Sequence, residues 1–183
     1  MEGFDFDFKK EKEEEFERKL ELKVIDSTDS EDFETLTMWF YHWWGKKYGR
    51  TEEYVRNYTT RNVLASKNGN TNNTLRIPEV YGIYQDGVLA GTFSITMCDT
   101  EERTDLYPWL ADVYVDEEYR GLGISKFLIK SSIKVAREKG LKCLYCYTAH
   151  DSLYEKYGFK FVELIKTEDE DNFYERLYKI DLN

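Results

Sequence analysis

Apolar and polar residues alternate in several short segments of the chain, which is the pattern of β-strands with one buried face. The segment 20–26, LELKVID, is the first of these. Asp86-Gly87 separates two later segments and is a strong signal for a two-residue hairpin turn. The expected strands are 20–26, 79–85, 88–97, 106–115, 142–148, 159–165 and 173–182.

Between these segments, apolar residues recur at helical spacing and indicate about four helices. A Ser or Thr three residues before a Glu, the spacing of a capping box, marks two of the helix starts. Gly140 ends the best specified helix, whose buried face begins at Ile124. The expected helices start at Thr28 (with Glu31), cover 51–64, run from Ile124 to Gly140, and cover 152–157 (with Ser152 and Glu155).

The first helix contains the run WFYHWW, which holds three of the chain's four tryptophans. Phe40, Trp43 and Trp44 fall on its main apolar stripe, so we expect them to pack in the core. Trp39 and Tyr41 lie off that stripe. A helix with aromatic residues on several faces is covered on more than one side or borders a pocket.

With 183 residues, the chain is long enough for one domain with a substantial core. We interpret the charge-dense residues 1–19 as an N-terminal extension and 20–183 as a single domain. No run approaches the roughly 20 apolar residues of a membrane span, and the first residues lack an apolar signal core. We therefore expect a cytoplasmic protein without a membrane partner.

The formal net charge is −10, which disfavours binding to nucleic acid or to an anionic membrane. Such a charge suits a cationic partner, although solubility alone also explains it. A homodimer is compatible with the sequence, but no residue identifies an interface.

The three cysteines, an odd and low count, fit a reducing compartment. Cys143 and Cys146 form a C-x-x-C pair, but they lie in an expected strand. A spacing of three in a strand places the two side chains on opposite faces, so we expect neither a metal site nor a redox pair.

Glycines and basic residues follow the expected strand 106–115, in the sequence RGLGIS at 120–125. Glycines let the backbone approach a ligand, and a helix N-terminus favours an anion, so this loop can cradle a pyrophosphate. A dinucleotide-binding loop needs a third glycine where Lys126 stands, and the Gly-Lys-Ser/Thr of a nucleotide triphosphatase is absent. From the glycines alone, an ordinary strand-to-helix turn explains the loop equally well.

The segment 109–125, WLADVYVDEEYRGLGIS, resembles the acyl-CoA-binding motif of the GNAT N-acetyltransferases. Arg120 and Gly123 stand at motif positions, and Ser125 replaces the usual Gly or Ala. The segment YEKYGF resembles the family's second motif, a tyrosine four residues before Gly-Phe. The order of elements also matches, over about 20–182.

The resemblance implies a mixed α/β fold with a largely antiparallel sheet of six to seven strands. In this fold the strand near 109–115 splays from the strand near 142–148, and the co-substrate acetyl-CoA enters the V-shaped gap. The residues implied in its binding are Val113, Tyr114 and Val115 for the pantetheine arm, and Arg120, Gly121, Leu122, Gly123, Ile124, Ser125 and Lys126 for the pyrophosphate.

The implied reaction is direct attack of an amine on the thioester, which needs a proton donor for the sulfur and a base for the amine. The resemblance places Tyr154 near the sulfur as the donor. For the base, the candidates are Glu79, Asp112 and His150. Strand alternation places Asp112 on the face opposite its two neighbours.

We therefore expect an N-acetyltransferase that transfers an acetyl group to a primary amine. The charge and the aromatic residues favour a small cationic acceptor, with Trp39, Tyr41, Glu79 and Trp109 as candidate contacts. An acetyltransferase acting on proteins or peptides, and a module that binds acyl-CoA without catalysis, are the alternatives.

Overall fold

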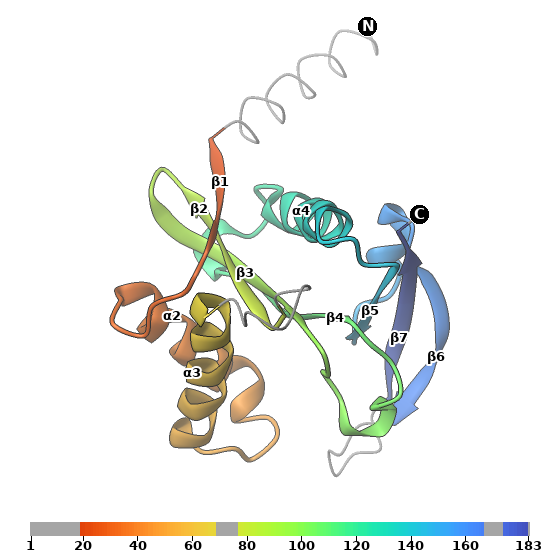
Figure 1. Cartoon of the computed structure of the whole chain (residues 1–183), viewed down its shortest axis with the longest axis horizontal. Helices are drawn as coiled ribbons and strands as arrows, with labels where there is room; N and C mark the ends of the chain where they lie inside the picture. Colours follow the sequence, from red (N-terminus) through yellow and green to blue (C-terminus); the bar gives the residue numbers. More distant parts are fainter. Residues whose placement is uncertain (1–18, 69–76, 167–173, 183) are drawn as a thin grey trace, which may run out of the picture.

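The computed structural model describes residues 19–68, 77–166 and 174–182, and it contains a seven-stranded sheet (Figure 1). The strand order is β1-β2-β3-β4-β5-β7-β6. Neighbouring strands are antiparallel, except that β4 and β5 are parallel. The strands are β1 Leu20–Val24, β2 Glu79–Gln85, β3 Val88–Thr96, β4 Trp109–Val115, β5 Cys143–Thr148, β6 Lys160–Lys166 and β7 Tyr174–Asp181. The predicted mixed, largely antiparallel sheet is confirmed, whereas the extension expected at 1–19 lies almost wholly outside the described residues.

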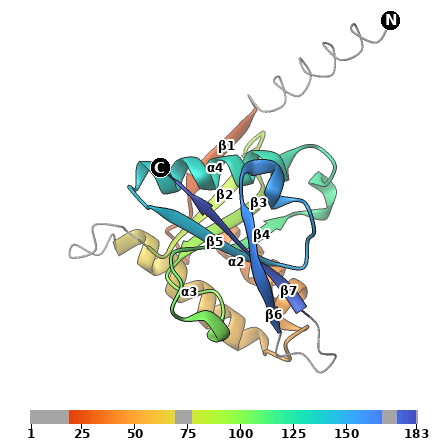
Figure 2. The ribbon, with the colours of Figure 1, turned by 90° about the vertical axis from the view of Figure 1, so that its right-hand side faces the viewer.

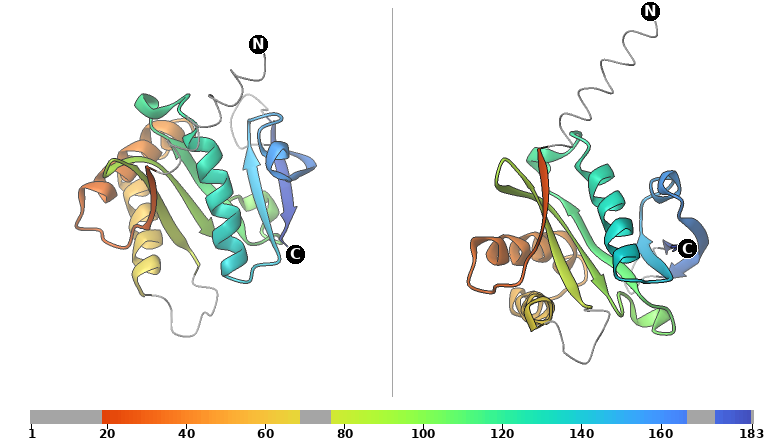
Figure 3. Two further views of the ribbon diagram at one scale, coloured as in Figure 1. Left: turned by 90° about the horizontal axis from the view of Figure 1, so that it is seen from above. Right: turned by 45° about the horizontal axis from the view of Figure 1, so that its top comes forward.

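Within the described residues, three α-helices cover this sheet: α2 Glu31–Phe40, α3 Glu52–Asn68 and α4 Ile124–Glu138. Helices α2 and α3 lie on one face and α4 on the other (Figures 1 and 3). Leu128 of α4 packs in one core with Phe93 of β3, and Leu36 of α2 packs in a second core with Val80 of β2. The sheet therefore separates an α4 face from an α2–α3 face.

One of the three expected helix starts marked by Ser or Thr is confirmed, and the other two differ from the expectation. Helix α2 is capped by Ser30, whose Oγ accepts a hydrogen bond from the Phe33 amide at 3.2 Å, so Thr28 lies outside the helix. Thr51 caps α3 as expected, since its Oγ1 accepts from the Tyr54 amide at 3.1 Å. The expected fourth helix is a 3₁₀ turn, η4 Tyr154–Tyr157, because Ser152 has φ 62° and does not cap it.

Helix α2 continues into a π-helical turn, η1 Tyr41–Gly45, which the apolar stripe did not predict. The wider π turn shifts the following side chains away from the α-helical spacing of 100° per residue. Phe40 is buried as expected, but Trp43 is 46% exposed instead of packing in the core. The expectation for Trp43 was wrong because it assumed a continuous α-helix.

Strands β4 and β5 pair at one position, Trp109 with Tyr145, and then separate. Strand β4 starts three residues later than expected because Pro108 has no N–H for a ladder. Beyond the opening lie β5, β7 and β6, from whose side Figure 2 views the molecule. The predicted splay is therefore present.

The cysteines also lie as the strand pattern predicts. Cys146 of β5 is buried in the core under α4, whereas Cys143 is partly exposed three residues earlier. Along β5 buried and partly exposed residues alternate, which places the two side chains on opposite faces. All three cysteines are free thiols.

Candidate active site

The loop between β4 and α4 is shaped as an anion cradle by two glycines in the left-handed region. Gly121 has φ 81° and Gly123 has φ 89°, and an added Cβ at either position would meet nothing within 4 Å. The Gly123 carbonyl accepts hydrogen bonds from the amides of Lys126 and Phe127. Within the described chain, no carbonyl accepts from the amides of 122–125, so these four donors are available to an anion.

Arg120 adds positive charge at this loop and is held in place by the end of β4. Its Nε donates to the Val115 carbonyl at 3.2 Å, and its guanidinium lies 5.7 Å from the centre of the Tyr114 ring. Glu117 pairs with the same guanidinium at 3.2 Å.

The edge of β4 that faces β5 is available to a ligand beyond the Trp109–Tyr145 pair. No described strand pairs with this edge from Leu110 to Val115. Unpaired strand edges accept extended ligands as an added strand. The pantetheine arm of acyl-CoA is an extended chain with two amide groups, so this edge fits it.

Asp112 lies at a β-bulge on the same strand, and this bulge corrects the predicted orientation of its side chain. Its φ is 53°, and the β3–β4 register shifts between Thr92 and Ser94. Ser94 pairs with Ala111 and also donates to Asp112 Oδ2 at 2.8 Å. Asp112 therefore shares a face with Ala111, towards α2 and α3, instead of lying opposite to it.

The environment of Asp112 changes its acidity. Tyr58 of α3 donates a second hydrogen bond to Asp112 Oδ2 at 3.0 Å. Burial raises the pKa of Asp112 to about 6, and the hydrogen bonds from Ser94 and Tyr58 partly offset this rise. A carboxylate with this pKa is ionised at neutral pH and can accept a proton, as a general base requires.

A further carboxylate, Asp99, lies near both Asp112 and Glu175, and the sequence had pointed to neither Asp99 nor Glu175. Asp99 follows β3 in a polar loop, and Glu175 is a buried residue on β7. Burial, together with the charges of Asp112 and Glu175, raises the pKa of Asp99 well above its usual value. Glu175 accepts hydrogen bonds from Lys47 Nζ at 3.3 Å and from the Tyr48 hydroxyl at 3.4 Å.

Tyr154 of η4 is placed beside these groups with its hydroxyl protonated. The side chain is buried, and its ring packs against Phe159 and Tyr178, with centroids 5.5 Å and 6.1 Å away. Burial, and then the charges of Cys146 and Asp99, raise the pKa of Tyr154 well above its usual value. The hydroxyl is therefore a proton donor across the physiological pH range.

Aromatic rings border the same face of β4. The ring of Tyr114 lies 5.0 Å from that of Trp39 and 5.6 Å from that of Trp43. We call Trp39, Trp43 and Tyr114 the aromatic surface. Of the two tryptophans, only Trp39 was among the expected acceptor contacts.

The structure does not bring the other candidate residues together with Asp112. Glu79 accepts from the Tyr81 hydroxyl and forms an ion pair with Lys139 at 2.5 Å, which places it on the α4 face. Trp109 is fully buried, and its Nε1 donates to the Leu106 carbonyl at 2.7 Å. It packs with Ile165 and Leu177 in a third core.

Two more candidates lie at the periphery. The imidazole of His150 is exposed, and only its backbone amide is held, by the Thr148 hydroxyl at 3.1 Å. Tyr41 packs against the core between α2 and α3, with Lys46 Nζ 5.2 Å from its ring centre. Neither side chain contacts the aromatic surface.

The chain matches the family model of the acetyltransferase (GNAT) family over residues 33–159. It belongs to the GNAT family of acetyltransferases. The enzyme is therefore an N-acetyltransferase that uses acetyl-CoA as co-substrate. A search of the curated proteins found no match.

Solved structures share the fold of this GNAT enzyme at low sequence identity. A GNAT acetyltransferase from Elizabethkingia anophelis with acetyl-CoA bound is 18% identical, with a TM-score of 0.58, and the match covers 90% of this chain and 99% of the other. An acetyltransferase from Salmonella typhimurium that modifies the N-terminal serine of ribosomal protein L7/L12 is 14% identical, with a TM-score of 0.64 and coverages of 90% and 96%. A putative acetyltransferase from Acinetobacter baylyi is 20% identical, with a TM-score of 0.64 and coverages of 89% and 93%.

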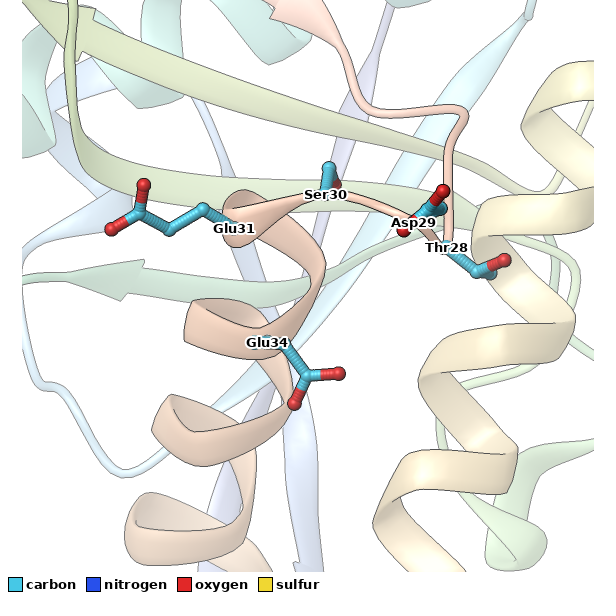
Figure 4. Close-up of a pocket in the computed structure, with 5 residues that line it drawn as sticks. All are labelled: Thr28, Asp29, Ser30, Glu31 and Glu34. Atoms are coloured by element: carbon cyan, nitrogen blue, oxygen red, sulfur yellow. The ribbon is translucent and has the colours of Figure 1, made fainter.

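A separate surface hollow of the GNAT enzyme lies at the start of α2 (Figure 4). Two of its side chains have structural partners: Ser30 caps α2, and Arg56 binds the Glu34 carboxylate at 2.7 and 2.8 Å. These contacts explain the hollow as a helix start. Its lining residues are Thr28, Asp29, Ser30, Glu31 and Glu34.

Among the residues that the structure describes, no group of three or more His, Cys, Asp or Glu side chains could hold a metal ion. None of the described helices is both long enough and apolar enough to cross a membrane.

Proposed function

We propose that this GNAT enzyme acetylates the primary amine of a small cationic molecule, by direct attack of the amine in a ternary complex with acetyl-CoA. The observation that carries the proposal is the buried carboxylate of Asp112 on the strand with the open edge, held by Ser94 and Tyr58. Asp99 interacts electrostatically with Asp112, with Glu175 and with Tyr154.

The charge of this group favours a cationic acceptor. Lys47 already pairs with Glu175, whereas the charged neighbours that shift the pKa of Asp99 are both carboxylates. Carboxylates that repel one another in a poorly solvated place are stabilised by a cation between them. The net charge of −10 also attracts cations from a distance.

Acetyl-CoA is held mainly by backbone groups in this proposal. The edge of β4 at 113–115 pairs with the pantetheine arm, and the amides of 121–125 bind the pyrophosphate, assisted by the charges of Arg120 and Lys126. These groups fix the thioester beside Asp112, and such positioning accounts for a large part of the rate.

Two side chains move the protons. A bound ammonium group has no free electron pair, so Asp112 first accepts a proton from it. The free amine then forms a bond to the acetyl carbon, and its nitrogen loses a second proton to water as the tetrahedral intermediate collapses. Tyr154 donates a proton to the sulfur as the carbon–sulfur bond breaks, so no charged thiolate has to leave. A backbone N–H near Val113 stabilises the negative charge that develops on the carbonyl oxygen. Glu79, Trp109, Tyr41 and His150 have no part in this proposal.

Thiol release from acetyl-CoA tests the proposal, measured against small amines, amino acids and a peptide that begins with serine. We expect turnover with small cationic amines. Asp99→Asn should raise KM for these amines by about tenfold, the effect of one lost charge contact, with little change in KM for acetyl-CoA. Turnover confined to the peptide or to anionic acceptors would contradict the proposed acceptor class and favour the protein-directed alternative.

A further inference from the structure

The aromatic surface contains a tryptophan, Trp43, that stays exposed to solvent. Its side chain is 46% exposed. The ring of Trp43 contacts that of Tyr114 and is not part of the core between α2 and α3. Large aromatic side chains contribute most when they are covered, so a tryptophan held at the surface beside a site indicates a ligand contact.

The β-bulge aligns this surface with the proposed base. Because Asp112 turns towards α2 and α3, it shares a face with Tyr114, two residues further along β4. Residues two apart on one face of a strand are about 7 Å apart. The aromatic surface therefore lies next to the carboxylate of Asp112, which is the proposed base.

Further rings enclose Asp112 from the side of α3. Tyr58 donates to its carboxylate, and the ring of Trp44 lies edge-on to Tyr58 at 5.4 Å. The π-helical turn produces this arrangement, because it carries Trp43 towards β4 while Trp44 stays near α3. Such turns occur frequently at functional sites.

We infer that the preferred acceptor is a primary amine joined through a short linker to a flat apolar ring, which rests on the aromatic surface while the amine lies at Asp112. This inference rests on the proposed function, because it uses Asp112 to place the reacting nitrogen.

A ring fits this surface better than a second cationic group of the acceptor does. A cation would be attracted to the face of Tyr114, but the guanidinium of Arg120 already lies 5.7 Å from that ring centre. A second positive charge would therefore meet Arg120, whereas an uncharged ring would pack between the two tryptophans.

The experiment compares kcat/KM for 2-phenylethylamine, propylamine and 1,3-diaminopropane. The wild-type enzyme should prefer the phenyl compound by about tenfold, which is the effect of one or two ring contacts. Trp43→Ala should remove most of this preference by raising KM for 2-phenylethylamine alone, and Trp43→Phe should restore part of it.

Tyr54→Ala is the matched control, because Tyr54 is also an exposed aromatic residue, 49% exposed on α3, and packs with Arg50 outside the aromatic surface. It should leave the preference unchanged. Calorimetry with CoA, giving the same affinity for each variant, verifies that the fold is intact.

Three results would overturn the inference. These are an equal or greater kcat/KM for the alkyl amines, an equal loss for all three amines in Trp43→Ala, and a change in preference among acyl-CoA chain lengths in that variant without a change among amines. The proposed function fails separately, if none of the three amines is acetylated while the serine peptide is.

Discussion

The two halves of the candidate active site are built in different ways. The proposed acetyl-CoA side consists of backbone groups from one continuous stretch, the edge of β4 and the loop 120–125. The proposed acceptor side consists of side chains from separate segments of the chain, with Asp99, Asp112 and Glu175 among them. A backbone site suits a co-substrate shared by a whole family, whereas a side-chain site can differ in each member without a change of fold.

The comparison predicts different sensitivities to mutation. The acetyl-CoA side depends on conformations that only glycine adopts easily, and most of its side chains can vary. The acceptor side depends on burial, charge and the chemistry of single groups, so isosteric changes there should alter rate and not affinity for CoA.

Gly123→Glu should have the largest effect. It places a side chain and a negative charge at the cradle, in a residue with φ 89°. Like charges in contact cost several kcal/mol, so CoA affinity in calorimetry should fall by about 10³-fold. Gly87→Glu is the control, because Gly87 also has a positive φ and open space, in the β2–β3 turn. Equal losses in both variants would show that the effect is not specific to the cradle.

Asp112→Asn should have the second largest effect. It should lower kcat/KM by about 10²–10³-fold, the range for a lost general base. The pKa of Asp112 is about 6, so wild-type kcat/KM should rise with pH through that value, whereas the variant should show no such rise. Asp32→Asn is the control, because the Asp32 carboxylate accepts from Tyr84 at 2.6 Å outside the site. A wild-type pH profile in Asp112→Asn would assign the base elsewhere.

Asp112→Asn should increase the stability of the folded enzyme, although it lowers the activity. Folding raises the pKa of Asp112 from 3.8 to about 6, so the folded state loses stability as the pH rises from about 4 to about 6; the cost is absent below about pH 4 and constant above about pH 6. Asp112→Asn should therefore raise the free energy of unfolding at pH 7.5, by about 3 kcal/mol at most, and much less at pH 4.5. Urea unfolding at the two pH values measures this difference.

Tyr154→Phe should lower kcat by about 10²-fold and leave CoA affinity unchanged, because it removes a proton donor but keeps the ring. Tyr178→Phe is the matched control: its ring also packs against Tyr154, and its hydroxyl donates to Glu155 at 2.7 Å. The control should lose stability but not rate. If Tyr154→Phe turns over at the wild-type rate, the hydroxyl has no role in proton transfer.

Ionic strength should have the smallest effect. Long-range attraction between the net charge of −10 and a cationic amine is screened by salt, so kcat/KM should fall a few-fold between low and physiological salt. A neutral acceptor should be almost indifferent to salt. Stopped assays with one cationic and one neutral amine at several salt concentrations make the comparison, and identical salt profiles would argue against charge steering.

The shape of the loop after β4, and the strands around it, could be predicted from the sequence for a physical reason. A site made of backbone groups requires particular residue types at neighbouring positions, such as Gly121 and Gly123 before Ile124. The alternation of apolar and polar residues located the strands around the loop. The acceptor side could not be predicted in the same way. The distance in sequence between Asp99 and Glu175 hides their proximity, because their segments meet only in the folded chain.

Local irregularities account for the remaining errors. The alternation of side chains along a strand did not predict the orientation of Asp112, because its positive φ turns the side chain to the face of Ala111. The α-helical spacing did not predict the exposure of Trp43, because α2 continues into a π-helical turn. Asp112 is neither glycine nor proline, and the π-helical turn contains a glycine only as its last residue, Gly45, after Trp43, so regular spacing gave no warning of either change.

The uneven placement of the tryptophans makes the enzyme its own optical probe. Trp39, Trp43 and Trp44 stand on the α2–η1 segment, whereas Trp109 is sealed in the core with 0% exposure. Emission from Trp109 should stay blue-shifted and insensitive to added quenchers as long as the chain is folded. Emission from Trp43 should be red-shifted and quenchable, and an acceptor that covers it should shift it towards shorter wavelengths. Fluorescence during an amine titration therefore reports on the acceptor side without any attached label.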